Sequence, residues 1–415
     1  MSNSLITPSL IAKEAVRLWK NENAFLRNVD TQYDDSFART GAKAGYQIRI
    51  RLPVDYVVRK GATASVQDTS EQVTSITVAT QAGVDMQFST ADLTMVIDDF
   101  SERYIAPAVN NIAGQIASDL MSTVETGAIG GAATQGGVCS LSANVDGSNN
   151  LLAPNQYTVL DARARLTSAS TPSSDYKLVM NPYSDAKLVG TLSNLYNPMS
   201  DISKQYRSGT MGRALGFDIF EDQTVLTHTN GSCTSASVAG ANQSGTTLLV
   251  SAITGTFNVG DIITIANVYG VNRITKASTG KLQQFVITAA AASGATSLSI
   301  YPAITPPQAG STVQYQTVTA SPANAAAVTP VLNPGITYRK NIAYSPEAIT
   351  LAMVDMDIPR GLPKDAVARE NQDGVAIRVL FWYNGSTDTQ LARTDVLYGG
   401  TITRPEWCVI VADVT

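Results

Sequence analysis

Residues 98–125 read DDFSERYIAPAVNNIAGQIASDLMSTVE, and this stretch decides the fold that we expect. Its apolar residues recur at spacings of four and three, which is one face of a helix with 3.6 residues per turn. They are Ile105, Val109, Ile112, Ile116, Leu120 and Val124. Asp98 and Asp99 supply N-cap chemistry, and Gly127 stands where a glycine would end the helix.

A helix over these residues would be roughly 40 Å long, well beyond the usual three or four turns. Pro107 lies inside the run, so either the helix kinks there or its regular part begins there with proline at the first position. A helix of this length is compatible with an ordinary core. Beside a projecting hairpin, however, it is more typical of a building block than of a catalyst.

The hairpin is expected directly before the helix. Apolar and polar residues alternate from Tyr46 to Leu52, and Ile76 to Phe88 repeat the same period of two. The two segments predict an antiparallel pair with a long tip near residues 54–71. A two-stranded ribbon is only marginally stable in water, so its apolar face needs cover. The pattern leaves open whether the same domain or a neighbouring subunit supplies that cover.

The other segments predict a mixed α+β protein. Residues 9–26 are amphipathic and predict an N-terminal helix. Helices are also expected at 157–167 and 185–195, with a short buried strand at 177–180 between them.

The sharpest change in composition follows. Between Gln223 and Tyr338 the only charged residues are Asp261, Arg273, Lys276 and Lys281. Short β-type runs separated by turn residues indicate a small all-β barrel or sandwich. The expected strands are 247–252, 261–266, 282–288 and 297–301. Since charge and helical pattern return at Arg339, we interpret residues 228–337 as an inserted domain.

Composition sets broad limits on the function. The chain has 415 residues, 44% of them hydrophobic, which is enough for two or three folding units. A net charge of −5 argues against a dedicated nucleic-acid binder. Three widely spaced cysteines encode neither a disulfide framework nor a CxxC metal site. The sequence shows no signal peptide and no long apolar run, so we expect a cytoplasmic protein with no membrane segment.

No stretch of the sequence builds an active site. The single histidine, His228, is expected in a loop at the insertion boundary, where a structural or exposed role is favoured over a catalytic one. Neither a GxSxG elbow nor a phosphate loop occurs. Asp355 and Asp357 would suit a cation on a shared strand face, but a solvated edge is the simpler interpretation. We therefore predict no enzyme activity, no cofactor and no metal.

Basic residues give the one candidate binding surface. Arg49, Arg51, Arg59 and Lys60 fall on the expected hairpin. A solvated strand face explains them, and so does contact with an acidic patch on a neighbouring subunit. Because Arg49 and Arg51 alternate with apolar residues and not with stacking aromatics, single-stranded nucleic acid is disfavoured. We predict these four as subunit-interface residues.

Several stretches together resemble the coat proteins of P22-type tailed bacteriophages. Residues 98–108 (DDFSERYIAPA) resemble the entry to that family's spine helix. Residues 209–219 (GTMGRALGFDI), followed by Thr227-His-Thr229, resemble its segment before the inserted domain. Residues 393–399 (RTDVLYG) and Arg404-Pro-Glu406 resemble its closing strands. The likeness covers nearly the whole chain and is weakest in the insertion and the first 40 residues.

The resemblance implies an α+β fold of the HK97-like capsid type with an inserted all-β, barrel-like domain. It implies the following division: N-terminal arm 1–42, extended hairpin loop 43–82, peripheral domain 83–155 with spine helix 98–126, axial domain 156–227, inserted β domain 228–337, second axial part 338–385 and closing peripheral strands 386–415. No motif matches the Lys–Asn isopeptide crosslink of the type member.

The implied function is a major capsid protein. Copies of the chain would form hexamers and pentamers of an icosahedral shell around double-stranded DNA, contacted non-specifically. Scaffolding and portal proteins are the implied partners, with assembly of a precursor shell in the host bacterial cytoplasm and a final place in the virion. Two alternatives are an encapsulin-like bacterial compartment shell and a carbohydrate-binding or hydrolytic β-module protein.

Overall fold

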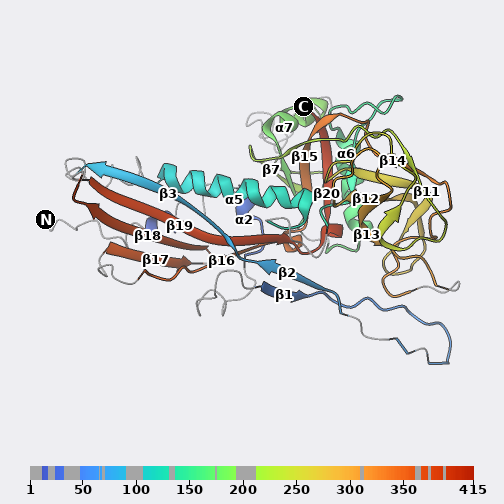
Figure 1. Ribbon diagram of the computed structural model, residues 1–415, viewed down its shortest axis with the longest axis horizontal. Helices are drawn as coiled ribbons and strands as arrows, with labels where there is room; N and C mark the ends of the chain where they lie inside the picture. The colour runs from blue at the N-terminus through green and yellow to red at the C-terminus, as the bar shows by residue number, and fades with distance from the viewer. Residues whose placement is uncertain are drawn as a thin grey trace, which may run out of the picture.

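The computed structural model describes residues 12–16, 24–31, 47–64, 66–67, 71–89, 106–129, 136–172, 175–192, 212–308, 313–359, 366–372, 375–386 and 389–415. Within these ranges the chain forms four β-sheets, with helices packed on two of them (Figure 1). Several predicted features lie outside the described residues. They are the caps Asp98 and Asp99, the first turns of the helix predicted at 98–125, and most of 9–26.

The long helix predicted at 98–125 is confirmed over its described part. Helix α5 runs Ala106–Thr126, and its buried side chains recur at helical spacing, from Val109 to Val124. Gly127 follows with φ +86° and donates its N–H to the Thr123 carbonyl oxygen at 2.6 Å, which ends the helix as expected. Pro107 is the second residue of the described helix, and the residue whose carbonyl its missing N–H would reach lies outside the described part.

Helix α5 lies along a long antiparallel sheet of its own chain (Figure 1). The strand order is β16 (Ile349–Val354), β19 (Thr389–Ile402), β18 (Val375–Asn384) and β17 (Val367–Gln372), and β3 (Thr80–Ser89) also pairs with the long strand β19. The apolar face of the helix and this sheet share one hydrophobic core. The helix therefore finds its cover inside the subunit.

Two consecutive glycines of β19 make this packing possible. A Cβ built on Gly400 would meet Leu120 Cδ1 of α5 at 2.6 Å, and one built on Gly399 would meet the Thr77 carbonyl oxygen at 2.1 Å. Successive strand residues face opposite sides, so the pair admits the helix on one face and the segment between β2 and β3 on the other.

A second sheet stands beside the end of α5. Its order is β4 (Leu141–Ser142), β20 (Cys408–Val414), β15 (Thr337–Tyr344), β5 (Lys177–Met180), β7 (Phe217–Glu221) and β6 (Arg213–Ala214), while β8 (Thr227–Thr229) pairs with β15. Helices α6 (Gln156–Ser168) and α7 (Pro182–Leu192) accompany it. Asn155 and Thr158 form a reciprocal capping box that begins α6.

Residues 236–330 form a six-stranded antiparallel sheet. The order is β10 (Gly245–Leu249), β13 (Ser297–Ile304), β12 (Ser278–Ile287), β11 (Ile262–Val271), β14 (Ala327–Pro330) and β9 (Ala236–Ser237). All four strands expected here are present, and two more complete the sheet. A hydrophobic cluster drawn only from residues between Cys233 and Val328 fills it. We call residues 231–335 the β unit.

The hairpin pairs as predicted but with a shorter second strand. Strands β1 (Gln47–Arg51) and β2 (Val73–Thr77) are antiparallel, with Ile50 opposite Thr74. The predicted segment Ile76 to Phe88 divides after Thr77, because β3 leaves the ribbon and pairs with β19. Ile50 and Ile76 pack on Ala352 and Leu397 of the five-stranded sheet under α5, which we call the α5 sheet, so the same subunit covers the base of the ribbon.

Strand pairing also differs from the expected division of the last third of the chain. Strands β16, β17 and β18, which fall in the expected second axial part 338–385, pair around β19 in the α5 sheet. Strand β20, expected among the peripheral closing strands, lies in the second sheet beside β15. The reason is the buried, apolar character of β20, which fits a central strand better than an edge.

Helix α2 (Ala24–Arg27) and two short 3₁₀ helices, η4 (Pro346–Ala348) and η6 (Pro405–Trp407), complete the described structure. Residues 12–16 are also helical, in agreement with the predicted N-terminal helix. Phe25 of α2 packs edge-on against Tyr344 at 5.9 Å between ring centroids, which joins this segment to the main core. Among the described residues, no helix is long and apolar enough to cross a membrane.

Candidate functional site

The extended loop between β1 and β2 is the part of the described chain that projects furthest from the sheets (Figure 1). The last backbone bond of its ladder joins Leu52 N–H to the Gln72 carbonyl oxygen at 2.9 Å. Beyond it, Gln67 clamps the two sides together, because its side chain accepts from Val57 N–H at 2.9 Å and donates to the Val57 carbonyl oxygen. Side chains, not strand pairing, therefore hold the outer part of the loop.

The four predicted interface residues all lie on this ribbon and all are exposed. Arg49 and Arg51 occupy the face of β1 opposite Ile48 and Ile50, and Arg51 pairs with Glu71 at 3.3 Å. Arg59 donates from Nη1 to the carbonyl oxygens of Gly61 and Thr63, the latter at 3.1 Å. The structure thus places two of the four on the strand and two, Arg59 and Lys60, in the outer loop.

Exposed apolar side chains accompany these charges. Val66 is 96% exposed, Val58 78% and Tyr56 56%. Scattered exposed apolar residues are normal on a protein surface, but three on one projecting loop provide a contact surface of the kind that subunit interfaces bury.

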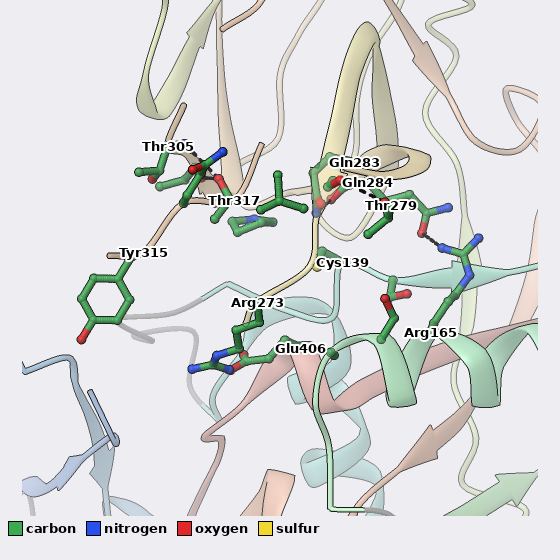
Figure 2. Close-up of a pocket in the computed structure, with 18 of the residues that line it drawn as sticks. Cys139, Arg165, Arg273, Thr279, Gln283, Gln284, Thr305, Tyr315, Thr317 and Glu406 are labelled. Atoms are coloured by element: carbon green, nitrogen blue, oxygen red, sulfur yellow. Dashed lines mark hydrogen bonds and ion pairs between the residues drawn. The ribbon is translucent and has the colours of Figure 1, made fainter. Parts of the chain in front are cut away.

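A cavity of about 720 Å³ lies where the loop base meets the β unit and helix α6 (Figure 2). Arg273 and Glu406 lie side by side at its edge, with Tyr315 nearby. Arg273 donates from Nε to the Asp55 carboxylate at 2.9 and 3.1 Å, and from Nη1 to Glu406 Oε1 at 2.9 Å. Burial lowers the pKa of Arg273, but the hydrogen bond that Arg273 donates to Asp55 and the charge of Glu406 outweigh it and raise that pKa.

Further polar contacts cross the same junction. Lys281 Nζ lies 2.5 Å from Asp161 Oδ1 of α6. Gln284 of β12 accepts from Leu141 N–H at 2.7 Å and from Arg165 Nη1 at 3.0 Å. The β unit is therefore joined to the strand before α6, to α6 itself and to the closing segment.

His228 forms the other junction, and it is buried in strand β8, not placed in a loop as expected. Its Nδ1 lies 2.8 Å from Glu125 Oε1 at the end of α5, and its Nε2 lies 2.8 Å from Asp261 Oδ1 of the β unit. Lys340 Nζ also contacts Glu125 Oε1 at 3.0 Å and donates to the Gly260 carbonyl oxygen. Four ionisable groups from four segments thus meet in the interior.

Burial and charge oppose each other in this cluster. Burial lowers the pKa of His228, yet the hydrogen bonds to Asp261 and Glu125 raise it above the ordinary value. Burial raises the pKa of Glu125, but the His228 hydrogen bond and the Lys340 charge lower it to about 2. A protonated His228 between two carboxylates is the state that this geometry favours.

Cys139, Asp355 and Asp357, which lie outside this cluster, have surroundings of a structural kind. Burial raises the pKa of the Cys139 thiol at the cavity to about 12, which keeps it protonated and unreactive. Asp355 pairs with Arg369 at 3.4 Å, and the Asp357 carbonyl oxygen accepts from Arg378. Within the described part of the chain, no three His, Cys, Asp or Glu side chains gather as metal ligands would.

Sequence reasoning missed both junctions. The signal was present in the scarcity of charge: of the four charged residues between Gln223 and Tyr338, Asp261 meets His228, while Arg273, Lys276 and Lys281 line the cavity. In a segment with so few charged residues, those that are present lie where the segment contacts the rest of the chain. The sequence shows that these charges are scarce, but it does not show which residues they pair with.

Comparison with known proteins identifies the class of this chain, a structural coat protein of bacteriophage shells. The family described as "P22 coat protein - gene protein 5" matches residues 38–411, and the chain belongs to that family. It is a major capsid protein that forms a phage shell and lies in the virion. A search of curated proteins finds no relative that matches the chain.

Solved structures of phage capsids resemble the chain remotely. The capsid of Ralstonia phage GP4 has 8% sequence identity and a TM-score of 0.46, covering 91% of this chain and 86% of that chain. The structure titled Mycobacterium phage Che8 has 11% identity and a TM-score of 0.43, covering 94% and 90%. The CUS-3 coat protein I-domain has 26% identity and a TM-score of 0.19, covering 23% of this chain and 94% of that domain.

Proposed function

We propose that this coat protein has the HK97-type subunit organisation and that its extended loop contacts a neighbouring subunit in the shell. In this arrangement α5 is the spine helix and the β unit is an inserted domain. The α5 sheet corresponds to the peripheral domain, and the second sheet with α6 and α7 to the axial domain. Strand pairing favours placing β16, β17 and β18 in the peripheral domain and β20 in the axial domain, in place of a division at residue 385.

One observation carries the proposal. The base of the loop is covered by its own subunit, whereas Tyr56, Val58 and Val66 further out are exposed on a segment with no strand pairing. Contact with another copy would bury them. Because a shell repeats each contact many times, weak contacts between individual subunits add up.

Arg49, Arg51, Arg59 and Lys60 would supply polar contacts around this apolar surface, as charged residues do at interface rims. We further propose scaffolding and portal proteins as assembly partners, hexamers and pentamers as the units of the shell, and non-specific contact with packaged double-stranded DNA. Assembly would take place in the host bacterial cytoplasm. Family membership favours this function over an encapsulin-like compartment or a carbohydrate-binding module.

The loop contact is tested by placing charge on the exposed apolar residues. We expect the double variant Val58→Asp, Val66→Asp to leave subunit unfolding in urea unchanged, because both side chains are exposed in the subunit. Shell formation, measured by sedimentation and negative-stain microscopy, should be lost, since burying unpaired carboxylates is costly.

Leu249→Asp is the matched control, because Leu249 is an exposed apolar residue of β10, outside the loop. Normal shells from the double variant, or equal loss from Leu249→Asp, would reject the loop as the contact.

A further inference from the structure

We propose that Arg273 is a positioning residue that ties the β unit to the extended loop and fixes the direction in which the loop leaves the subunit. The inference deepens the proposed role of the loop in the shell and rests on it only for the consequence in assembly. Three segments far apart in sequence meet at this one guanidinium: Asp55 of the loop, Arg273 of the β unit and Glu406 of the closing segment.

The geometry suits a fixed connection. An arginine presents several N–H donors in one plane, so it can hold two carboxylates at once, which a lysine cannot do in the same way. Here Nε serves Asp55 and Nη1 serves Glu406. All three side chains are partly exposed, at 25% for Arg273, 21% for Asp55 and 34% for Glu406.

The turn that carries Arg273 is itself held by hydrogen bonds. It joins β11 to β12, and the Asn272 side chain accepts from the N–H groups of Ile274 and Thr275 at 2.9 and 3.0 Å. Asn272 also bonds through its backbone to Lys276 and Ala277, both at 2.8 Å. The guanidinium is therefore presented from a defined backbone and not from a free loop tip.

The loop needs such a contact, because its strand pairing ends at Leu52 and Gln72. Asp55 lies three residues further out, before the Val57–Gln67 clamp. Tyr315 of the β unit makes a second contact there, a hydrogen bond with the Asp55 backbone. Without an anchor at Asp55, the ribbon beyond Leu52 would pivot on its own base.

A positioning role differs from a stabilising one in what it changes. Partly exposed ion pairs contribute little to subunit stability, so loss of this one should leave the unfolding midpoint nearly unchanged. It should instead widen the range of loop directions.

The experiment measures loop direction in the unassembled full-length chain. Spin labels at Thr63→Cys in the loop and Ser244→Cys in the β unit report a distance distribution by pulsed electron paramagnetic resonance. The native cysteines are buried and should not label. We expect a narrow distribution in the parent chain and a clearly broader one with Arg273→Gln or with Asp55→Asn.

Two further variants sharpen the test. Arg273→Lys keeps the charge but not the double contact, so its distribution should lie between the parent and Arg273→Gln. Lys281→Gln is the matched control, because it removes another cation of the β unit that contacts α6 and not the loop. It should leave the distribution unchanged.

The inference is overturned if Arg273→Gln and Asp55→Asn both keep the narrow parental distribution, or if Lys281→Gln broadens it equally. Failure of the proposed loop contact is a separate result, seen when the Val58→Asp, Val66→Asp variant still forms shells. If both proposals hold, the Arg273→Gln chain should form fewer closed shells and more irregular products at unchanged subunit stability.

Discussion

At the scale of single residues, the contact between His228, Glu125 and Asp261 joins three parts of the fold through one imidazole. Breaking a buried ion pair by removing one partner leaves an uncompensated charge and costs about 3–5 kcal/mol. His228 and Asp261 are nearly inaccessible to solvent, so this larger value applies and not the small one for surface pairs. The cluster holds the end of α5 against the start of the β unit.

The cluster predicts a pH dependence of stability. The pKa of His228 is raised above its ordinary value of 6.5 in the folded chain, because Asp261 and Glu125 accept hydrogen bonds from the imidazole. A raised pKa contributes stability that is fully present below pH 6.5 and is lost as pH rises through the folded value. We expect His228→Gln to lower the free energy of unfolding by about 3 kcal/mol at pH 6 and by less at pH 9.

Urea unfolding of the parent and the variant at both pH values measures this difference. In the parent chain Glu125, whose pKa is lowered from 4.5 to about 2, contributes stability that is lost only as pH falls below 4.5, outside the range measured. A destabilisation that grows from pH 6 to pH 9 would show that His228 is neutral in the folded chain.

At the scale of elements, the packing of α5 on β19 depends on Gly399 and Gly400. We expect Gly400→Ala to lower the free energy of unfolding by about 1–3 kcal/mol, because the new Cβ overpacks against Leu120. Gly399→Ala should cost at least as much, since its Cβ would meet backbone atoms, which move less readily than a side chain. Urea midpoints measure both effects.

Gly114 on α5 is the matched control. A Cβ there meets nothing within 4 Å, and alanine is the better helix former, so Gly114→Ala should stabilise by about 0.5–1 kcal/mol. Equal effects of all three substitutions would mean that backbone entropy, and not close packing, explains the glycines.

Elements were predictable from the sequence where a period was long and uninterrupted. The described part of α5, strand β1 and helix α6 follow the apolar pattern, since each buries a single face, whereas β5 is a short run that is buried throughout. The division of Ile76 to Phe88 was not predictable, because the alternation continues while the pairing partner changes from β1 to β19. The period of the apolar residues shows which face of a strand or helix is buried, but it does not show which element covers that face.

The candidate site shows the same limit. Arg49, Arg51, Arg59 and Lys60 were assigned to the ribbon from their place in the pattern, and they lie there. The Asp55–Arg273 contact spans 218 residues, and His228 meets Glu125 across 103. No local spacing encodes such pairs, so only the folded chain reveals them.

At the scale of the whole molecule, the β unit is both separate and attached. Its ends lie together, since Asn230 N–H bonds to the Ile336 carbonyl oxygen at 3.0 Å and Gly335 N–H to that of Gly231 at 3.1 Å. It has its own hydrophobic cluster, yet Ile262 and Val286 pack in the main core of the subunit. The adjacent ends and the separate hydrophobic cluster predict that the β unit folds by itself. The packing of Ile262 and Val286 in the main core predicts that the rest of the chain depends on the β unit.

We expect residues 230–336, expressed alone, to unfold in one cooperative transition in urea. The remaining chain, with 231–335 replaced by a short Gly-Ser linker, should aggregate or unfold at much lower urea. It loses the buried contact of Asp261 with His228 and exposes the core that Ile262 and Val286 cover. Sizing chromatography and urea titration of both pieces measure this. If the chain with the linker is as stable as the parent, the β unit does not support the rest of the subunit. Its few charges would then only hold the β unit in place.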